Sequence, residues 1–180
     1  EIADRDWSSD VCSSDLPVMF LWFDTEFIED GCTIDLLSIG VVREDGATYY
    51  AEPEEANRAL ASPWVRENVL PHLTGPMKPR AEIALDLVRF AGPSPRFWAY
   101  YADYDWVALC QLYGRMLDLP KGWPMYCRDL KQVGDMFGVA DLSALVPQDG
   151  TEHNALSDAQ WCRDAWMYLR QHVVPAAVIM

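Results

Sequence analysis

Two carboxylates stand next to each other at the end of an apolar run near the start of the chain. Asp24 and Glu26 follow the run Val18–Phe23, with Thr25 between them. The run predicts a buried strand, on which residues i and i+2 point to the same face about 6.5–7 Å apart along the chain. Two carboxylates held on one rigid element are suited to binding hard divalent cations over a phosphate group. The alternative for this pair taken alone is two exposed acids at a strand end.

Two later segments add groups of the same chemical kind. Asp105 precedes a second apolar run, Trp106–Tyr113, and His153 and Asp158 stand at the start of the last predicted helix. The side chains of residues five apart in a continuous helix point in directions about 140° apart around the helix axis. His153 and Asp158 can therefore face one site only if His153 lies at or before the helix cap. Asn154 is a good N-cap residue and fits this arrangement. The alternative for His153 is a loop histidine without a functional role.

Apolar runs, prolines and turn residues predict the elements that must position these groups, in the order βββαβαβα. After the first strand, the expected strands cover residues 35–44, 47–52, 96–101 and 124–128. The expected helices cover 80–91, a stretch from 105, the stretch 129–138 and the stretch 154–172. A further helical stretch is expected from residue 53, broken near Pro63 and again at Pro71.

The order Asp-x-Glu, Asp, His-x-x-x-x-Asp resembles the DEDDh 3′-5′ exonucleases, a superfamily that includes ribonuclease T, oligoribonuclease and proofreading exonucleases. Asp24–Gly31, Leu37–Val42 and Tyr104–Leu112 look still more like a small family of bacterial and phage 3′-5′ exoribonucleases. The resemblance runs from about Met19 to about Leu169. It implies one α/β domain over residues 17–180 with a ribonuclease H-like mixed sheet. In such a sheet three antiparallel strands are extended by parallel strands and flanked by helices.

The resemblance also implies roles for the five groups. Two divalent metal ions, Mg²⁺ or Mn²⁺, are expected, with Asp24 shared between them. Glu26 and Asp158 would complete the first metal site, and Asp105 would hold the second ion directly or through water. His153 would be the general base that takes a proton from the attacking water, because an unperturbed imidazole has a pKa of about 6.5. The product would be a nucleoside 5′-monophosphate released from the 3′ end of single-stranded RNA.

The second motif leaves one alternative open. The superfamily usually has asparagine four residues before the second-motif aspartate, and this chain has Tyr101 there. Asp103 is a rival for the metal-binding role if the helix begins one turn earlier than expected. We expect Asp105 to have that role, because Tyr-Asp is the dipeptide of the smaller family.

Thr25 and Phe27 are expected to contact substrate. Phe27 follows the first motif, where the superfamily often stacks the terminal base, and such stacking contributes about 1–3 kcal/mol per base. The alternative for Phe27 is a core position, and Tyr104 and Trp106 are interpreted as core residues. Four basic residues after the second motif are interpreted as a solvated face rather than as phosphate contacts: Arg115, Lys121, Arg128 and Lys131.

The formal net charge of −14 argues against extended duplex binding, which depends on many phosphate contacts by lysine and arginine. It favours a short or single-stranded substrate held at its 3′ end. An exonuclease acting on DNA would use the same site, so the preference for RNA comes only from the resemblance, as does an expected homodimer or larger assembly. A binding module that had lost catalysis would normally lack one of the five groups, and none is missing.

The first sixteen residues are unlike the start of such a domain. Asp6–Leu16 matches the translation of a common sequencing adapter. We therefore expect residues 1–16 to be a non-native, disordered leader and the natural start to be Met19. The alternative is that these residues are not an artefact but a disordered polar leader of the protein.

The remaining composition indicates a globular protein of the cytoplasm. No run approaches the roughly 18 apolar residues that a membrane span needs. Four well-spaced cysteines follow the leader and form no Cys-x-x-Cys pair: Cys32, Cys110, Cys127 and Cys162. Their apolar settings favour buried thiols in a reducing compartment over disulfides or a zinc site.

Overall fold

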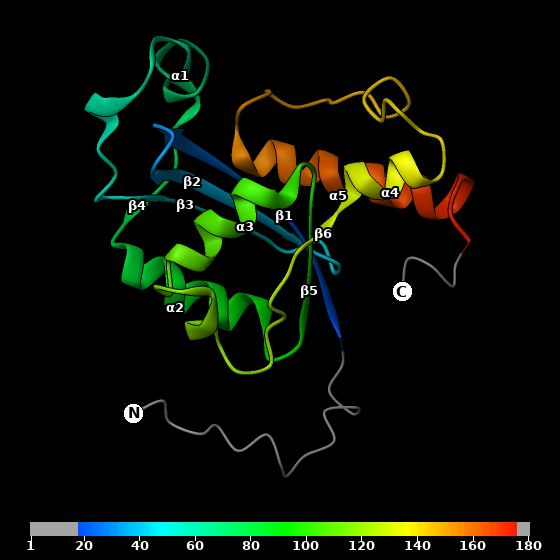
Figure 1. Ribbon diagram of the computed structural model, residues 1–180, viewed down its shortest axis with the longest axis horizontal. Coiled ribbons are helices and arrows are strands. Elements are labelled where there is room, and N and C mark those ends of the chain that lie inside the picture. The colour runs from blue at the N-terminus through cyan, green and yellow to red at the C-terminus, as the bar shows by residue number, and fades with distance from the viewer. Residues whose placement is uncertain (1–17, 176–180) are drawn as a thin grey trace.

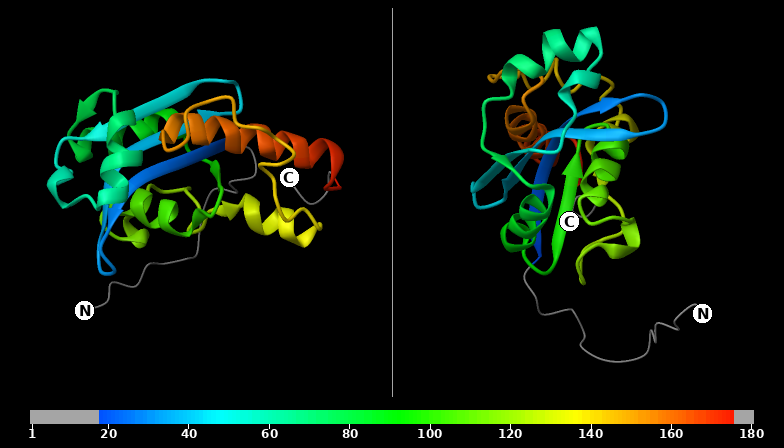
Figure 2. Two further views of the ribbon diagram at one scale, coloured as in Figure 1. Left: turned by 90° about the horizontal axis from the view of Figure 1, so that it is seen from above. Right: turned by 90° about the vertical axis from the view of Figure 1, so that its left-hand side faces the viewer.

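Residues 18–175 are described in the computed structural model, and they form a six-stranded mixed sheet covered by helices (Figures 1 and 2). The strand order is β4-β3-β2-β1-β5-β6. The strands are β1 (Met19–Glu29), β2 (Ile34–Arg43), β3 (Thr48–Pro53), β4 (Met77–Lys78), β5 (Pro95–Ala99) and β6 (Arg128–Asp129). The expected leader, 1–16, lies outside the described residues.

The pairing of the strands confirms the expected mixed sheet. β1 and β2 are antiparallel, as are β2 and β3, whereas β5 runs parallel to β1 and β6 parallel to β5. The two-residue β4 adds a parallel edge beside β3. The main helices are α1 (Pro63–Asn68), α2 (Arg80–Ala91), α3 (Ala102–Gln111), α4 (Leu130–Met136) and α5 (Ala155–His172).

The alternation of side chains along β1 divides the core between the two faces of the sheet. Leu21 and Phe23 belong to a buried cluster that includes residues of α2 and α3. Trp22 points the other way, into a cluster with α5, where its ring lies 5.0 Å from that of Trp166. Asp24 continues the Trp22 face because residues i and i+2 of a strand share a face. The first carboxylate therefore points toward the side of the sheet that α5 covers.

The first strand is longer than the apolar run predicts. Pairing with β2 continues to Glu29, with a register shift between Glu26 and Phe27. The prediction that Asp24 and Glu26 lie at a strand end was wrong, because Phe27 and Ile28 supply further apolar residues that continue the strand. The two acids are instead held in the middle of a paired strand.

Three other predicted boundaries also differ. The helix expected after Asp105 begins earlier, at Ala102. The helical stretch expected from residue 53 is the end of β3, a turn and a short 3-10 helix, Arg58–Leu60. The expected break at Pro63 is instead the start of α1, after Ser62, whose hydroxyl accepts a hydrogen bond from the Val65 N–H. The strand expected at 124–128 is limited to Arg128–Asp129, because only these two residues pair with β5.

The N-terminus of α5 lies unusually close to the sheet at Gly40. Gly40 pairs with Asp24 across β1 and β2. A Cβ atom on Gly40 would lie 2.3 Å from the carbonyl carbon and oxygen of Ala155. Only glycine permits this approach, and the approach brings the first turn of α5 beside Asp24.

None of the helices in the described part of the chain is long and apolar enough to cross a membrane.

Gly40→Ala is expected to lower the free energy of unfolding by more than about 2 kcal/mol, because the added methyl overpacks a rigid backbone contact. Chemical denaturation of both proteins measures the difference. Gly31→Ala is the matched control, because its methyl would meet nothing within 4 Å and its effect is limited to left-handed backbone strain of about 1 kcal/mol. Equal losses for the two variants would contradict a tight contact at Gly40.

Candidate active site

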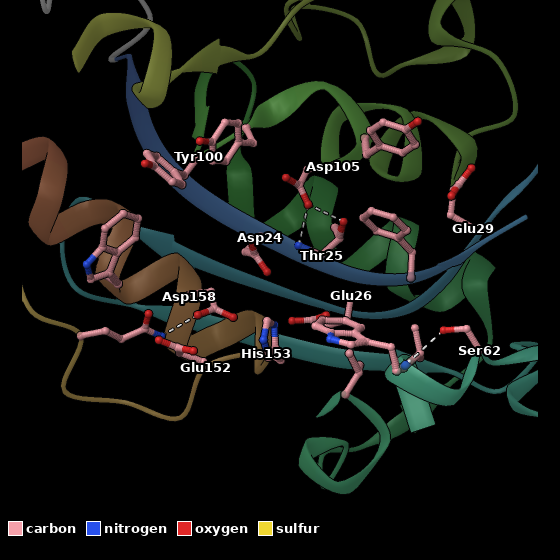
Figure 3. A pocket seen from close by; sticks show the side chains of 18 of the residues that line it. Asp24, Thr25, Glu26, Glu29, Ser62, Tyr100, Asp105, Glu152, His153 and Asp158 are labelled. Atoms are coloured by element: carbon pink, nitrogen blue, oxygen red, sulfur yellow. Dashed lines mark hydrogen bonds between the residues drawn. The ribbon is translucent and has the colours of Figure 1, made fainter. Parts of the chain in front are cut away.

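Three carboxylates from two elements converge on one point. Asp24 and Glu26 come from β1 and Asp158 from the first turn of α5, and one oxygen of each lies within 4.8 Å of the others. Figure 3 shows these side chains facing the same opening. Oxygen-only ligands at such short separations match the ligand preference of hard divalent cations such as Mg²⁺ and Mn²⁺. The residues present therefore fit a metal site.

The helix cap explains how Asp158 reaches this point. The side-chain oxygen of Asn154 accepts a hydrogen bond from the Ser157 N–H at 3.1 Å, so the predicted N-cap is confirmed. Asp158 then lies one turn into the helix. Its Oδ1 accepts a hydrogen bond from Gln148 Nε2 at 2.5 Å. Gln148 lies in the loop between α4 and α5, where no periodicity or motif identified it in the sequence.

His153 directly precedes the cap, as the five-residue spacing requires. Its backbone is left-handed, with φ of 61°, and its ring packs edge-to-face on Trp64 of α1 at a centroid distance of 4.9 Å. His153 lines the same cleft as the three carboxylates (Figure 3). Trp64 was not identified from the sequence, because a tryptophan in a short helix carries no motif.

Asp105 lies beside the other three acids but is held differently. Its Oδ1 accepts hydrogen bonds from the Thr25 backbone N–H at 2.9 Å and from the Thr25 hydroxyl at 2.6 Å. Asp105 is buried and lines the cleft, whereas the rival Asp103 is exposed and does not. Although α3 begins earlier than expected, Asp105 is the aspartate of this helix that faces the site. Its role as a metal ligand stays a prediction.

Thr25 connects the first and second motifs. Its side chain is buried, and both of its donors are directed at Asp105. The observed contact is therefore one that positions Asp105 against β1. The expected contact between Thr25 and substrate stays a prediction.

Aromatic rings form much of the rest of the cleft, which has a volume of about 910 Å³. Phe27 stacks on Tyr104 with a centroid distance of 5.7 Å and an interplanar angle of 10°. The interpretation of Tyr104 as a core residue was wrong, because its position on α3 leaves it half exposed, whereas Trp106 is buried as expected. The remaining aromatic residues of the lining were not assigned to the site from the sequence: Trp64, Tyr100, Tyr101 and Trp161.

Apart from His153, the charged side chains of the cleft are all acidic. Six carboxylates line it: Asp24, Glu26, Glu29, Asp105, Glu152 and Asp158. No lysine or arginine among the described residues belongs to the lining. Arg115 pairs with Asp118 outside the cleft and is exposed, in agreement with a solvated face. Lys131 pairs with Asp135, also outside the cleft, but its side chain is only 18% exposed, so the interpretation as a solvated residue was wrong for it.

Burial and mutual repulsion raise the pKa values of the clustered carboxyls. Burial, followed by the charges of Asp158 and Asp105, raises the pKa of Glu26 to about 8. Burial raises the pKa of Asp105 to about 7, against the lowering effect of the Thr25 hydrogen bonds. The pKa of Asp24 is raised well above its ordinary value by burial and by the neighbouring acids. A bound cation would remove this repulsion and favour the ionised forms.

The metal-free protein is expected to lose stability as the pH rises from about 4.5 to about 8. In this window the folded carboxyls keep protons that the unfolded chain has released, so a higher pH favours unfolding. Thermal unfolding in chelator, measured across this range, tests the sign. Addition of Mn²⁺ is expected to raise the melting temperature more at pH 8 than at pH 5. A metal-free stability that rises steadily through this window would contradict the described burial.

Sequence comparisons identify relatives with a stated activity. A family model described as a 3′-5′ exoribonuclease Rv2179c-like domain matches residues 19–170. The 3′-5′ exoribonuclease Rv2179c of Mycobacterium tuberculosis is 43% identical over 150 residues, which cover 79% of this chain and 88% of that protein.

Structural comparisons agree on the fold. Exonuclease I aligns with a TM-score of 0.64 at 14% identity over 86% of this chain, which spans only 41% of the length of that protein. A chain from the structure of the yeast NOT1 MIF4G domain co-crystallized with CAF1 aligns with a TM-score of 0.53 at 12% identity, covering 85% of this chain and 80% of that one. At these identities the likeness concerns the fold alone, and it confirms the predicted ribonuclease H-like mixed sheet.

Proposed function

Because the chain belongs to the Rv2179c-like 3′-5′ exoribonuclease family, we propose that it removes nucleoside 5′-monophosphates from the 3′ ends of single-stranded RNA. The observation that carries this proposal is the convergence of Asp24, Glu26 and Asp158, whose oxygens lie within 4.8 Å of one another. The cleft around them is open and lined by aromatic rings, which suits an unpaired nucleic acid strand.

Two divalent metal ions, Mg²⁺ or Mn²⁺, are proposed as the cofactors. Asp24, Glu26 and Asp158 would hold one, and Asp105 together with Asp24 would hold the other. Such ions would supply charge stabilisation for the attacking and leaving oxygens of an in-line displacement. The short hydrogen bond from Gln148 fixes one Asp158 oxygen, and the two Thr25 donors fix one Asp105 oxygen. These bonds set the direction in which the remaining oxygens point.

His153 is proposed as the general base. Its imidazole would accept the proton of the attacking water and pass it to solvent through the open side of the cleft. The edge-to-face contact with Trp64 restricts the orientation of the ring. Phe27, stacked on Tyr104, is proposed to support the terminal base.

Asp24→Asn is expected to lower the rate of RNA shortening by about 10⁴- to 10⁶-fold, the scale on which removing one member of a catalytic group acts. The assay follows 5′-labelled single-stranded RNA and the matching DNA with Mg²⁺, Mn²⁺ or chelator. The same variant is expected to melt at a higher temperature than the parent in chelator, because asparagine cannot ionise and so avoids the cost of burying an acid beside the other carboxyls.

A metal-dependent ladder that shortens from the 3′ end, absent in Asp24→Asn, would support the exonuclease, and the RNA-to-DNA ratio would give the sugar preference. Shortening of DNA alone would favour the DNA exonuclease. Failure to shorten either strand with either metal would contradict catalysis and favour a nucleic-acid-binding module.

His153→Ala is expected to lower kcat by about 10²- to 10⁴-fold with little effect on metal binding, because general-base catalysis contributes on that scale. His172→Ala is the matched control, since His172 lies at the far end of α5 against Tyr168. Single-turnover kinetics measure the chemical step. A His153→Ala enzyme as fast as the His172→Ala enzyme would exclude His153 as the base.

The assembly and the cellular location are also proposals. The family resemblance favours a homodimer or larger assembly, which light scattering would reveal as a mass above that of one chain. The described cysteines are free thiols, which favours a reducing cytoplasm. Cys110 and Cys162 are buried as expected, whereas the expectation of a buried thiol was wrong for Cys32, which is exposed.

A further inference from the structure

Tyr101 has a backbone conformation that its side chain disfavours. At the N-terminus of α3 its φ and ψ are 58° and 50°, in the left-handed region. Glycine or asparagine adopts this region readily, whereas a bulky residue there is destabilised by about 1–2 kcal/mol. Among the described residues other than glycine, only Tyr101 and His153 have a positive φ. Both residues line the same cleft, and backbone strain of this kind concentrates at functional sites.

The Tyr101 ring is exposed but firmly supported. It is 61% exposed, and it packs edge-to-face on Tyr100 with a centroid distance of 4.7 Å. Tyr100 in turn packs on Trp161 at 4.9 Å. The Trp161 indole N–H donates a hydrogen bond to the Val146 carbonyl oxygen at 2.7 Å, which anchors the series. The three rings form a rigid wall with a free surface at Tyr101.

This wall lies on the other side of the carboxylates from the Phe27 end of the cleft. Figure 3 shows Tyr100 on one side of Asp24 and Asp105, with Glu29 and Ser62 on the other. Phe27 belongs to the same end of β1 as Glu29. The cleft thus has an aromatic surface on each side of the site where a phosphodiester would react.

The chemistry of the cleft limits what the free Tyr101 surface can bind. Among the described residues, the lining holds six carboxylates and no lysine or arginine, so apart from His153 its side chains offer no ion pair to a free phosphate or another anionic group. A nucleobase is neutral and presents a flat π-face, which is the ligand that an exposed, supported aromatic ring accepts.

We propose that Tyr101, backed by Tyr100 and Trp161, stacks the base of the penultimate nucleotide of the RNA strand. The inference rests on the proposed function and adds a second substrate base that the enzyme contacts. A 3′ exonuclease places the bond between the last two nucleotides at its carboxylates, so their bases lie on opposite sides of the site. If the terminal base lies against Phe27, the penultimate base lies against Tyr101.

The test compares a single-stranded RNA hexamer with the same hexamer made abasic at its penultimate nucleotide. The abasic change is expected to lower kcat/KM of the parent enzyme by roughly 5- to 100-fold. Tyr101→Asn is expected to lower kcat/KM for the intact hexamer by a similar factor and to be insensitive to the abasic change. Tyr101→Phe, which keeps the ring, is expected to retain that sensitivity.

Thermal unfolding separates this role from a structural one. Tyr101→Asn is expected to be at least as stable as the parent, because asparagine suits the left-handed backbone. Tyr126→Asn is the matched control, since Tyr126 is an exposed tyrosine outside the cleft lining, and it is expected to leave kcat/KM unchanged. A parent enzyme indifferent to the penultimate base, or a Tyr101→Asn enzyme equally sensitive to it, would overturn the proposal.

The same comparison can be made without hydrolysis. If the parent shortens no RNA, the proposed function fails, and the affinity of both hexamers in Ca²⁺ is then measured by fluorescence anisotropy. Weaker binding of the abasic hexamer by the parent but not by Tyr101→Asn would support the stacking surface alone. Equal affinities for the two hexamers would overturn it.

Discussion

Repulsion between buried carboxylates is the constraint on which the rest of this structure depends. Asp24, Glu26 and Asp158 are brought to within 4.8 Å although burial and the neighbouring acids raise the free energy of ionising Asp24 and Glu26. A fold tolerates such an arrangement only if its backbone holds the groups in place independently of them. Here the central strand and the packed start of α5 do so, with Gly40 as the contact that allows the helix to approach.

The two faces of the sheet contribute to the site in different ways. On the α5 face, the strand alternation that buries Trp22 also directs Asp24 toward the helix. On the opposite face, Thr25 points toward α3 and holds Asp105 through two hydrogen bonds. One strand therefore positions carboxylates on both faces of the sheet. The apolar clusters hold α3 against one face and α5 against the other.

The sequence predicted the parts of the site that depend on local rules. The i, i+2 spacing placed Asp24 and Glu26 on one face of a strand, and the Asn154 cap allowed His153 and Asp158 to face one site. The grouping of these residues with Asp105 came from the family resemblance. The fold type followed from the order of the elements and from the family resemblance. The length of β1 was missed because Asp24 interrupts the apolar run, although backbone pairing with β2 continues past it.

Residues whose role depends on tertiary contact could not be identified in advance. Gln148 reaches Asp158 from a loop without periodicity, and Trp64 reaches His153 from a short helix far away in sequence. Tyr104 resembled a core residue because it adjoins an apolar run, and only the start of α3 at Ala102 turns it outward. Tyr101 was noted only as a departure from asparagine, since its backbone conformation is invisible in the sequence.

The proposed function requires the convergent carboxylates to form a divalent cation site. Calorimetric titration of the protein with Mn²⁺ at pH 7, repeated in buffers of different ionisation enthalpy, measures both the number of ions bound and the protons released. We expect binding of two ions with net proton release, because the pKa of Glu26 is raised to about 8 and this carboxyl therefore holds a proton at pH 7 in the metal-free protein. Absence of binding, or binding without proton release, would contradict it.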